Sequence, residues 1–303
     1  MEVSIVCPIH GDGKYLCYTL DSIKSQSFRG SMEVVLVLDR CSSEVSATIA
    51  KFRDSLNIKV ISTNNPGLVE ALNAGLQIST GKYVARIDSD DLMAPSRIER
   101  QLEFLEANQQ ITVLGSSVTE INEHGVVIGK REYPIESIEM YNSLSRQCTI
   151  AHPSVMFRRD EILNLGGYRP FFENAEDYDL WLRVRESGSI TSTIETLTFY
   201  RIHPGQISTL LLEQRIFGSY SAKINSTLER KGLKNLISRY GTFERWGNSR
   251  LGKFILQYVS FRLSISVKIQ NFENGNLEGK LLENLVVGKV LLPLKKWKKR
   301  RKT

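Results

Sequence analysis

The chain has 303 residues, of which 41% are hydrophobic and 24% charged. This composition is typical of a folded globular protein and excludes a collagen-like or disordered one. Four cysteines without a Cys-x-x-Cys pair predict free thiols in a reducing compartment. No apolar run reaches the roughly 20 residues of a transmembrane helix, and the first residues lack the pattern of a secretory signal. We therefore expect a cytoplasmic protein.

The net charge of +7 is unevenly distributed along the chain. Residues 1–204 contain 20 Lys and Arg against 27 Asp and Glu, whereas residues 205–303 contain 20 against 6. This asymmetry predicts an acidic catalytic part, followed by a basic part that seeks an anionic surface.

The first hundred residues alternate between strand and helix patterns. Strand-like runs cover residues 3–7, 33–38, 58–61 and 83–87. Apolar residues at helical spacing cover residues 15–26, 43–56 and 68–78. This βαβαβαβ order predicts a Rossmann-like, mostly parallel α/β sheet flanked by helices. Ligands of such sheets bind beyond the carboxyl ends of the strands.

The pattern changes after residue 110. Strands are expected at 111–120, 126–131 and 194–201, and a helix at 176–186. From about residue 205 the sequence becomes mostly helical and basic. We therefore expect a domain boundary near residues 205–215.

An acidic string, Asp88-Ser89-Asp90-Asp91, follows the fourth predicted strand. Three carboxylates this close repel one another unless a cation or solvent neutralises them. Mg²⁺ and Mn²⁺ prefer such oxygen ligands and commonly bridge them to substrate phosphates. The alternative is a solvated acidic turn that caps the helix expected near Pro95. The position of the string at a strand end favours a metal site.

Two other acidic positions have a functional and a structural interpretation. Asp39 ends the second predicted strand, where it could accept hydrogen bonds from a base or ribose, or simply form a turn. Glu176 and Asp177 open a predicted helix, where a carboxylate could act as a general base or only complement the helix dipole.

Two histidines are further candidates. His203 follows a predicted strand and could complete a metal shell or bind a diphosphate, with a structural loop histidine as the alternative. His152, before Pro153, is less expected to contact a ligand. The sequence has no P-loop or GxGxxG fingerprint, so nucleotide binding of those two kinds is not expected.

Together these residues resemble the family 2 inverting glycosyltransferases of the GT-A fold. Seven stretches match in order and spacing: 4–8, 22–26, 35–39, 67–75, 85–91, 152–158 and 176–183. One departure lies after the first-strand proline, where the family often has an aromatic residue and asparagine but this chain has Ile9 and His10. That departure affects how the nucleotide base is expected to pack, but not the resemblance to this class of glycosyltransferase.

The resemblance implies specific roles. Asp39 would contact the nucleotide base and Asp88 the nucleoside, and Asp90 would ligate Mn²⁺ or Mg²⁺ on the donor diphosphate. Asp177 would be the catalytic base, and His203 would lie near the metal. The loop at Pro8 and the turn at Gly67 would complete the nucleotide site. Supporting roles in the same site are expected for Arg86, Asp91, His152, Glu176 and Arg201.

The expected activity is inverting transfer of a hexose or N-acetylhexosamine from a nucleotide sugar, with UDP as the nucleotide. The acceptor implied is a saccharide linked to a lipid diphosphate, in O-antigen or capsule synthesis. Residues 1–208 would form the catalytic domain, with a nucleotide half at 1–105 and an acceptor half at 106–208. The alternatives are a sugar nucleotidyltransferase and a membrane-bound scaffold without activity.

Residues 209–303 are expected to form a helical, basic extension. Seven of the last nine residues are Lys or Arg, with Trp297 among them. Basic residues and tryptophan favour an anionic membrane surface, so we expect peripheral binding at the inner face of the membrane. The alternative is a disordered solubilising tail. Nucleic-acid binding is not expected, because no RNA-binding motif accompanies the charge.

Overall fold

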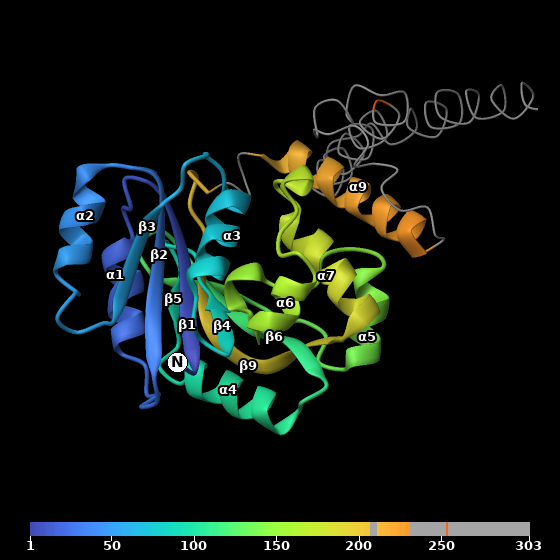
Figure 1. Cartoon of the computed structure of the whole chain (residues 1–303), viewed down its shortest axis with the longest axis horizontal. Coiled ribbons are helices and arrows are strands. Elements are labelled where there is room, and N and C mark those ends of the chain that lie inside the picture. Colours follow the sequence, from blue (N-terminus) through green and yellow to red (C-terminus); the bar gives the residue numbers. More distant parts are fainter. Residues whose placement is uncertain (207–210, 231–252, 254–303) are drawn as a thin grey trace, which may run out of the picture. The chain divides into compact units, whose positions relative to one another are not determined.

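The computed structural model describes residues 1–206, 211–230 and 253 (Figure 1). Its helices and strands belong to one compact unit, Met1–Ser249. Within it a mixed sheet has the strand order β3-β2-β1-β4-β8-β6-β9-β5, and β7 pairs with β6. Most of its strands run in one direction, and helices cover both faces, as the sequence predicted.

The first half of the sheet follows the expected alternation of strands and helices. Its parallel strands are β1 (Val3–Gly11), β2 (Met32–Cys41), β3 (Ile58–Ser62) and β4 (Tyr83–Arg86). The helices between them are α1 (Leu16–Lys24), α2 (Ser43–Ala50) and α3 (Leu68–Ile78). Alternate side chains of β1 and β2 point to opposite faces, so one set packs under α3 and the other under α1 and α2.

Several boundaries differ from the sequence prediction, among them the end of the second helix and the end of the first strand. The helix expected over 43–56 ends at Ala50, where the backbone tightens and the Phe52 N–H donates to the carbonyl of Ile49 at 3.0 Å. The first strand was expected to end at Pro8, but β1 continues to Gly11 and Pro8 pairs in register with Val37. Pairing between β1 and β4 stops at Val6, so the missing N–H of Pro8 removes no hydrogen bond on that side.

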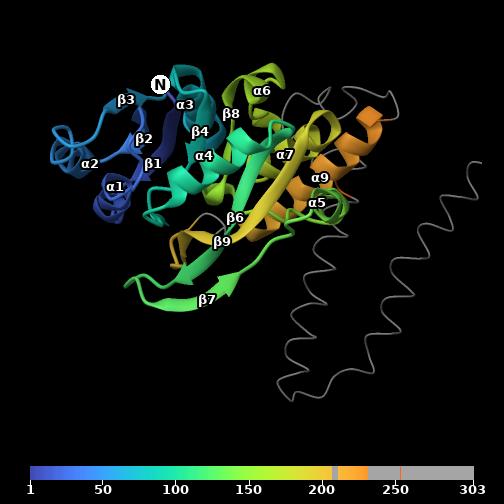
Figure 2. The ribbon, with the colours of Figure 1, turned by 90° about the horizontal axis from the view of Figure 1, so that it is seen from below.

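The second half of the sheet is mixed. The long strands β6 (Ile111–Ile121) and β9 (Ser189–Arg201) pair in parallel, and β7 (Val127–Arg131) adds to β6 at the edge (Figure 2). Two very short strands were not predicted. The strand β8 (Met156–Arg158) joins β4 to β6, and β5 (Leu92–Met93) pairs with β9. Strands of two or three residues show no alternation that a sequence could reveal.

The remaining described helices surround this half of the sheet. They are α4 (Arg97–Ala107), α5 (Ser137–Leu144), α6 (Arg159–Asn164), α7 (Glu176–Ser187) and α9 (Leu212–Arg230), with short 3₁₀ turns at His152–Ser154 and Pro170–Phe172. Both α5 and α9 pack on α7. Among the described residues, no helix is long and apolar enough to cross a membrane. The helix α9 fits the expected helical extension, but the tail at 295–303 lies outside the described residues.

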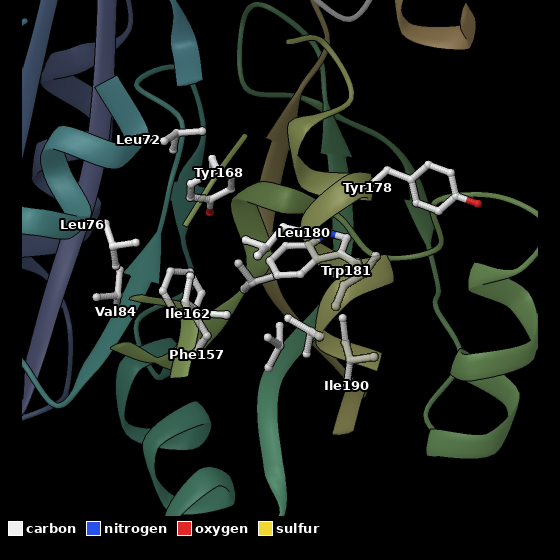
Figure 3. Packing of buried hydrophobic residues seen from close by; sticks show 14 of the residues in the cluster. Leu72, Leu76, Val84, Phe157, Ile162, Tyr168, Tyr178, Leu180, Trp181 and Ile190 are labelled. Atoms are coloured by element: carbon white, nitrogen blue, oxygen red, sulfur yellow. The ribbon is translucent and has the colours of Figure 1, made fainter. Parts of the chain in front are cut away.

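A buried apolar cluster fixes the elements that carry the functional residues. Leu72 and Leu76 of α3 face Phe157 of β8 and Tyr168, while Trp181 fills the space beneath α7 (Figure 3). Trp181 is fully buried. This close packing holds the carboxyl ends of β1, β2 and β4, together with the first turn of α7, in fixed positions. Ligands of such sheets bind at these strand ends, so functional side chains placed there are held accurately.

Candidate functional site

The acidic string lies directly after β4, as predicted. Carboxylate oxygens of Asp88, Asp90 and Asp91 all lie within 4.8 Å of one another. The hydroxyl of Thr19 in α1 lies 2.8 Å from the carbonyl oxygen of Asp91 and 2.9 Å from that of Ser89, so hydrogen bonds hold the loop against α1. The loop is therefore a fixed, acidic feature at the carboxyl end of the sheet.

Arg86, the last residue of β4, supports this loop. Its guanidinium forms a two-point ion pair with Asp88, including a 2.6 Å contact between Nη1 and Oδ2. Burial raises the pKa of the Asp88 carboxyl, and Asp90 adds to that rise, although Arg86 opposes it. The positive charge of Arg86 is thus too small to neutralise the clustered carboxylates of the loop. The remaining negative charge favours the binding of a cation.

Asp91 and Arg201 connect the loop to the end of β9. The backbone N–H of Arg201 donates to Asp91 Oδ1 at 2.7 Å, and its guanidinium Nε donates to the carbonyl of Asp90 at 2.8 Å. The other oxygen of Asp91, Oδ2, is buried without a hydrogen-bond partner. Burial, with Asp90, raises the pKa of Asp91 well above its ordinary value. A buried, unpartnered carboxylate oxygen is costly unless a ligand satisfies it.

His203 reaches the same loop from a position 113 residues further along the chain. Its Nε2 lies 2.9 Å from Asp90 Oδ2, and its ring packs 5.2 Å from that of Tyr15. Oxygen ligands from clustered aspartates, with one imidazole beside them, suit Mn²⁺ or Mg²⁺. The unpartnered Asp91 oxygen and this convergence of side chains therefore fit a divalent cation.

The predicted nucleotide residues Asp39 and Gly67 are in direct contact. The Gly67 N–H donates to Asp39 Oδ2 at 3.0 Å, and Arg40 Nε donates to Oδ1 at 3.1 Å. Burial would raise the pKa of Asp39, but these two hydrogen bonds and the Arg40 charge hold it below its ordinary value. The nearby Nδ1 of His10 lies 3.3 Å from Oδ2. The sequence does not predict that His10 and Arg40 contact Asp39, because these contacts depend on the register of β1 and β2.

Glu176 and Asp177 occupy the first turn of α7. Asp177 is half-buried, and its Oδ1 accepts the N–H of Tyr178 at 2.6 Å. Burial raises its pKa, which makes the carboxylate a stronger base. Glu176 is buried, its Oε2 has no hydrogen-bond partner, and burial together with Asp177 raises its pKa to about 8. Both residues therefore have properties beyond those of simple helix-terminal charges.

Asp179, one turn into the same helix, has a purely structural environment. Its carboxylate is paired with both Arg169 and Arg183. This pairing joins α7 to the segment before it, so Asp179 has a structural role. Among the acidic residues of this first turn, Glu176 and Asp177 therefore remain as candidates for catalysis.

His152 lies in the apolar core. Its Nε2 is 2.9 Å from the Tyr168 hydroxyl, and its ring packs on those of Tyr168 and Trp181. Burial, with the positive charge of Arg86, lowers its pKa well below the ordinary value and keeps it neutral. Its contacts support the elements beneath the site.

Arg97 of α4 was not anticipated from the sequence. It is fully buried and donates to the carbonyls of Arg86, Pro153 and Val155. These hydrogen bonds join the end of β4 to the segment before β8, directly under the acidic loop. Tyr15 was also missed, although it lies between His203 and the Arg201 guanidinium, which is 4.5 Å from its ring centroid.

A sheet in the order β3-β2-β1-β4, with an acidic loop after β4 and a mixed second half, defines a GT-A-type glycosyltransferase fold. The family model "Glycosyl transferase family 2" matches residues 4–166, which is more than half of the chain. The chain therefore belongs to glycosyl transferase family 2 and is a glycosyltransferase, so the nucleotidyltransferase alternative is dropped.

Two bacterial relatives illustrate the similarity. The O-antigen biosynthesis glycosyltransferase WbnJ of Escherichia coli is 29% identical over 240 residues, which cover 78% of this chain and 92% of WbnJ. The amylovoran biosynthesis glycosyltransferase AmsE of Erwinia amylovora is 33% identical over 171 residues. That match covers 56% of this chain and 63% of AmsE, so it spans less than two thirds of that relative.

Solved structures support the fold. Staphylococcus aureus TarS 1–349 in complex with UDP-GlcNAc superposes with a TM-score of 0.58 at 16% identity, covering 82% of this chain and 79% of TarS 1–349. The mannosyltransferase PcManGT of Pyrobaculum calidifontis, in complex with GDP-Man and Mn²⁺, gives a TM-score of 0.59 at 15% identity. This superposition covers 98% of this chain and 82% of the PcManGT chain. At these identities the similarity is one of fold.

Proposed function

We propose that the protein transfers a hexose or N-acetylhexosamine from a nucleotide sugar, with UDP as the nucleotide, to a saccharide acceptor with inversion. The observation that carries this proposal is the convergence of Asp90, Asp91 and His203 at the end of β4. The biosynthetic roles that WbnJ and AmsE are named for support a place in cell-surface polysaccharide synthesis, such as O-antigen or capsule. The ligands of the two solved neighbours support a nucleotide-sugar donor.

In this proposal the donor lies across the carboxyl ends of β1, β2 and β4. Asp39 and the Gly67 turn contact the base, Pro8 lies beneath it, and Asp88 contacts the nucleoside. Asp90 and His203, with Asp91 beside them, hold Mn²⁺ or Mg²⁺. The bound cation neutralises negative charge on the donor diphosphate. Arg86 and Arg201 keep the acidic loop in place through their contacts with Asp88 and Asp90.

Asp177 acts as the general base. Its carboxylate takes the proton from an acceptor hydroxyl while that oxygen attacks the anomeric carbon. The bond between the anomeric carbon and the diphosphate breaks on the opposite face, so the configuration inverts. The nearby Glu176, whose pKa is about 8, is mostly protonated at neutral pH and adds no second negative charge.

The same proposal assigns different roles to the two parts of the chain. Residues 1–208 form the catalytic domain, with nucleotide (1–105) and acceptor (106–208) halves. Residues 209–303 hold the enzyme at the anionic inner face of the membrane, where a lipid-diphosphate-linked acceptor would be found. The acidic and basic charge of the two parts supports this arrangement.

A donor panel tests the proposal. Nucleoside diphosphate release from UDP and GDP sugars should be measured with Mn²⁺ and with EDTA. We expect one donor to turn over in a metal-dependent way. Asp177→Asn should still bind that donor but turn over about 10²–10⁴-fold more slowly. If no donor binds or turns over, and EDTA changes nothing, the scaffold alternative replaces the enzyme.

A further inference from the structure

One buried aromatic ring has polar neighbours instead of apolar ones. Tyr15, the residue before α1, is 6% exposed, yet it belongs to neither of the two apolar clusters in the described part of the chain. Its ring centroid lies 5.2 Å from that of His203, 4.5 Å from the Arg201 guanidinium carbon and 4.8 Å from the Lys14 ammonium nitrogen. Packing of the apolar core therefore does not explain why this ring is buried.

The helix that follows Tyr15 fixes it beside the acidic loop. The N–H of Thr19 donates to the carbonyl of Tyr15 at 3.2 Å. The hydroxyl of the same Thr19 donates to the carbonyl oxygens of Ser89 and Asp91. The first turn of α1 thus connects the ring and the loop, so Tyr15 has a defined position relative to the carboxylates.

His203 is the neighbour for which orientation matters most. Its Nε2 lies 2.9 Å from Asp90 Oδ2, and its backbone N–H donates to Gln206 Oε1 at 3.1 Å. Among the residues that the structure describes, none forms a hydrogen bond with Nδ1. A metal-ligating histidine usually has a hydrogen-bond partner at its second ring nitrogen, which fixes the direction of the imidazole. Here the Tyr15 ring is the contact that can fix it instead.

The ring of Tyr15, and not its hydroxyl, provides this contact. The hydroxyl is buried without a hydrogen-bond partner among the described residues. Aromatic rings attract one another at centroid distances of about 4.5–7 Å, and a guanidinium within about 6 Å of a ring centroid is attracted to the ring. Arg201, whose Nε donates to the carbonyl of Asp90, therefore packs on the same ring as His203. One aromatic side chain supports both residues that reach the acidic loop from the end of β9.

We propose that Tyr15 is a positioning residue, which holds the His203 imidazole in the direction that the divalent cation requires. The proposal rests on the proposed function in one respect, which is the role of His203 as a ligand of that cation. Tyr15→Phe keeps the ring contact, whereas Tyr15→Leu removes it. The affinity for Mn²⁺ should fall about tenfold in Tyr15→Leu and stay within about twofold of wild type in Tyr15→Phe.

The test is Mn²⁺ binding to the full chain in the presence of UDP, measured from the EPR signal of the free ion, so that no turnover is needed. The matched control is Tyr18→Leu, on the same helix, whose exposed side chain should leave the affinity unchanged. If Tyr15→Leu does not fold, Tyr15→Met takes its place, because methionine also lacks the ring but fills more of its space.

The same change is also made in the His203→Ala background. If Tyr15 acts through the imidazole, Tyr15→Leu should cost no further Mn²⁺ affinity when the imidazole is absent. General damage to the site would instead lower the affinity in both backgrounds. This comparison separates a positioning role from a merely structural one.

Two results overturn the positioning role: an affinity of Tyr15→Leu within about twofold of wild type, or a loss that persists in full in the His203→Ala background. Failure of the proposed function looks different. In that case wild type binds no Mn²⁺ in the presence of UDP, or His203→Ala binds it as tightly as wild type.

Discussion

Replacing Glu33 with glutamine should destabilise the fold by a predictable, pH-dependent amount. Glu33 lies on β2 with a fully buried side chain. Its Oε1 accepts the hydroxyl of Ser4 at 2.6 Å and the N–H of Thr80 at 2.8 Å. Its Oε2 is 2.7 Å from the ammonium of Lys59. These contacts join β1, β2, β3 and the turn before β4.

The pKa of Glu33 gives the size of the effect. Burial alone would raise the pKa, but Lys59, Ser4 and Thr80 together lower it from 4.5 to about 2. A pKa difference of this size corresponds to about 3 kcal/mol of folding free energy at neutral pH. Because the folded pKa is depressed, that stability is present above pH 4.5 and is lost as the pH falls towards 2. At pH 3 about 1.5 kcal/mol should remain.

Urea unfolding of wild type and Glu33→Gln between pH 7 and pH 3 measures this contribution. The matched control is Glu106→Gln, which removes an exposed ion pair with Lys82 and should change stability by less than about 1 kcal/mol. A loss for Glu33→Gln that is below about 1 kcal/mol at pH 7, or that does not shrink as the pH falls, would refute the reasoning.

Two further predictions concern the site. Gly67→Ala places a side chain at φ +124°, with its Cβ 2.7 Å from Glu173 Oε1. It should lose about 1–3 kcal/mol in urea unfolding and raise the donor KM, because the Gly67 N–H positions Asp39. Adding Glu173→Ala should restore little; full recovery would implicate the side-chain clash instead of backbone strain. Glu176→Gln should become more stable relative to wild type as the pH rises from 4.5 to about 8, because over this range the wild-type carboxyl ionises in the unfolded chain but stays protonated where it is buried in the folded protein. Thermal melts at pH 5 and pH 8 check this, and an unchanged difference would contradict it.

Much of the nucleotide half could be predicted from the sequence. The helix 68–78 matches α3 at both ends, because Gly67 and Ser79 interrupt a regular apolar spacing. The acidic loop was expected in its place because ligand groups collect at the carboxyl ends of parallel strands. Local patterns of this kind depend on few distant contacts.

The convergence of Asp91 and Arg201 could not be derived from the sequence. It follows from the pairing of β5 with β9, where Leu92 lies opposite Phe199. A two-residue strand has no periodicity, so nothing in the sequence shows that residues 110 positions apart are joined. The neighbours of Asp39 depend on register and packing in the same way.

The central claim is that Asp90 holds the metal and donor whereas Asp177 performs the proton transfer. Calorimetric titration of UDP into the protein, with and without Mn²⁺, tests it most directly when combined with donor turnover. The account predicts Mn²⁺-dependent UDP binding in wild type and in Asp177→Asn, and its loss in Asp90→Ala. Turnover should be lost in Asp90→Ala and should fall about 10²–10⁴-fold in Asp177→Asn. Metal-independent UDP binding that survives in Asp90→Ala, or full turnover by Asp177→Asn, would contradict the account.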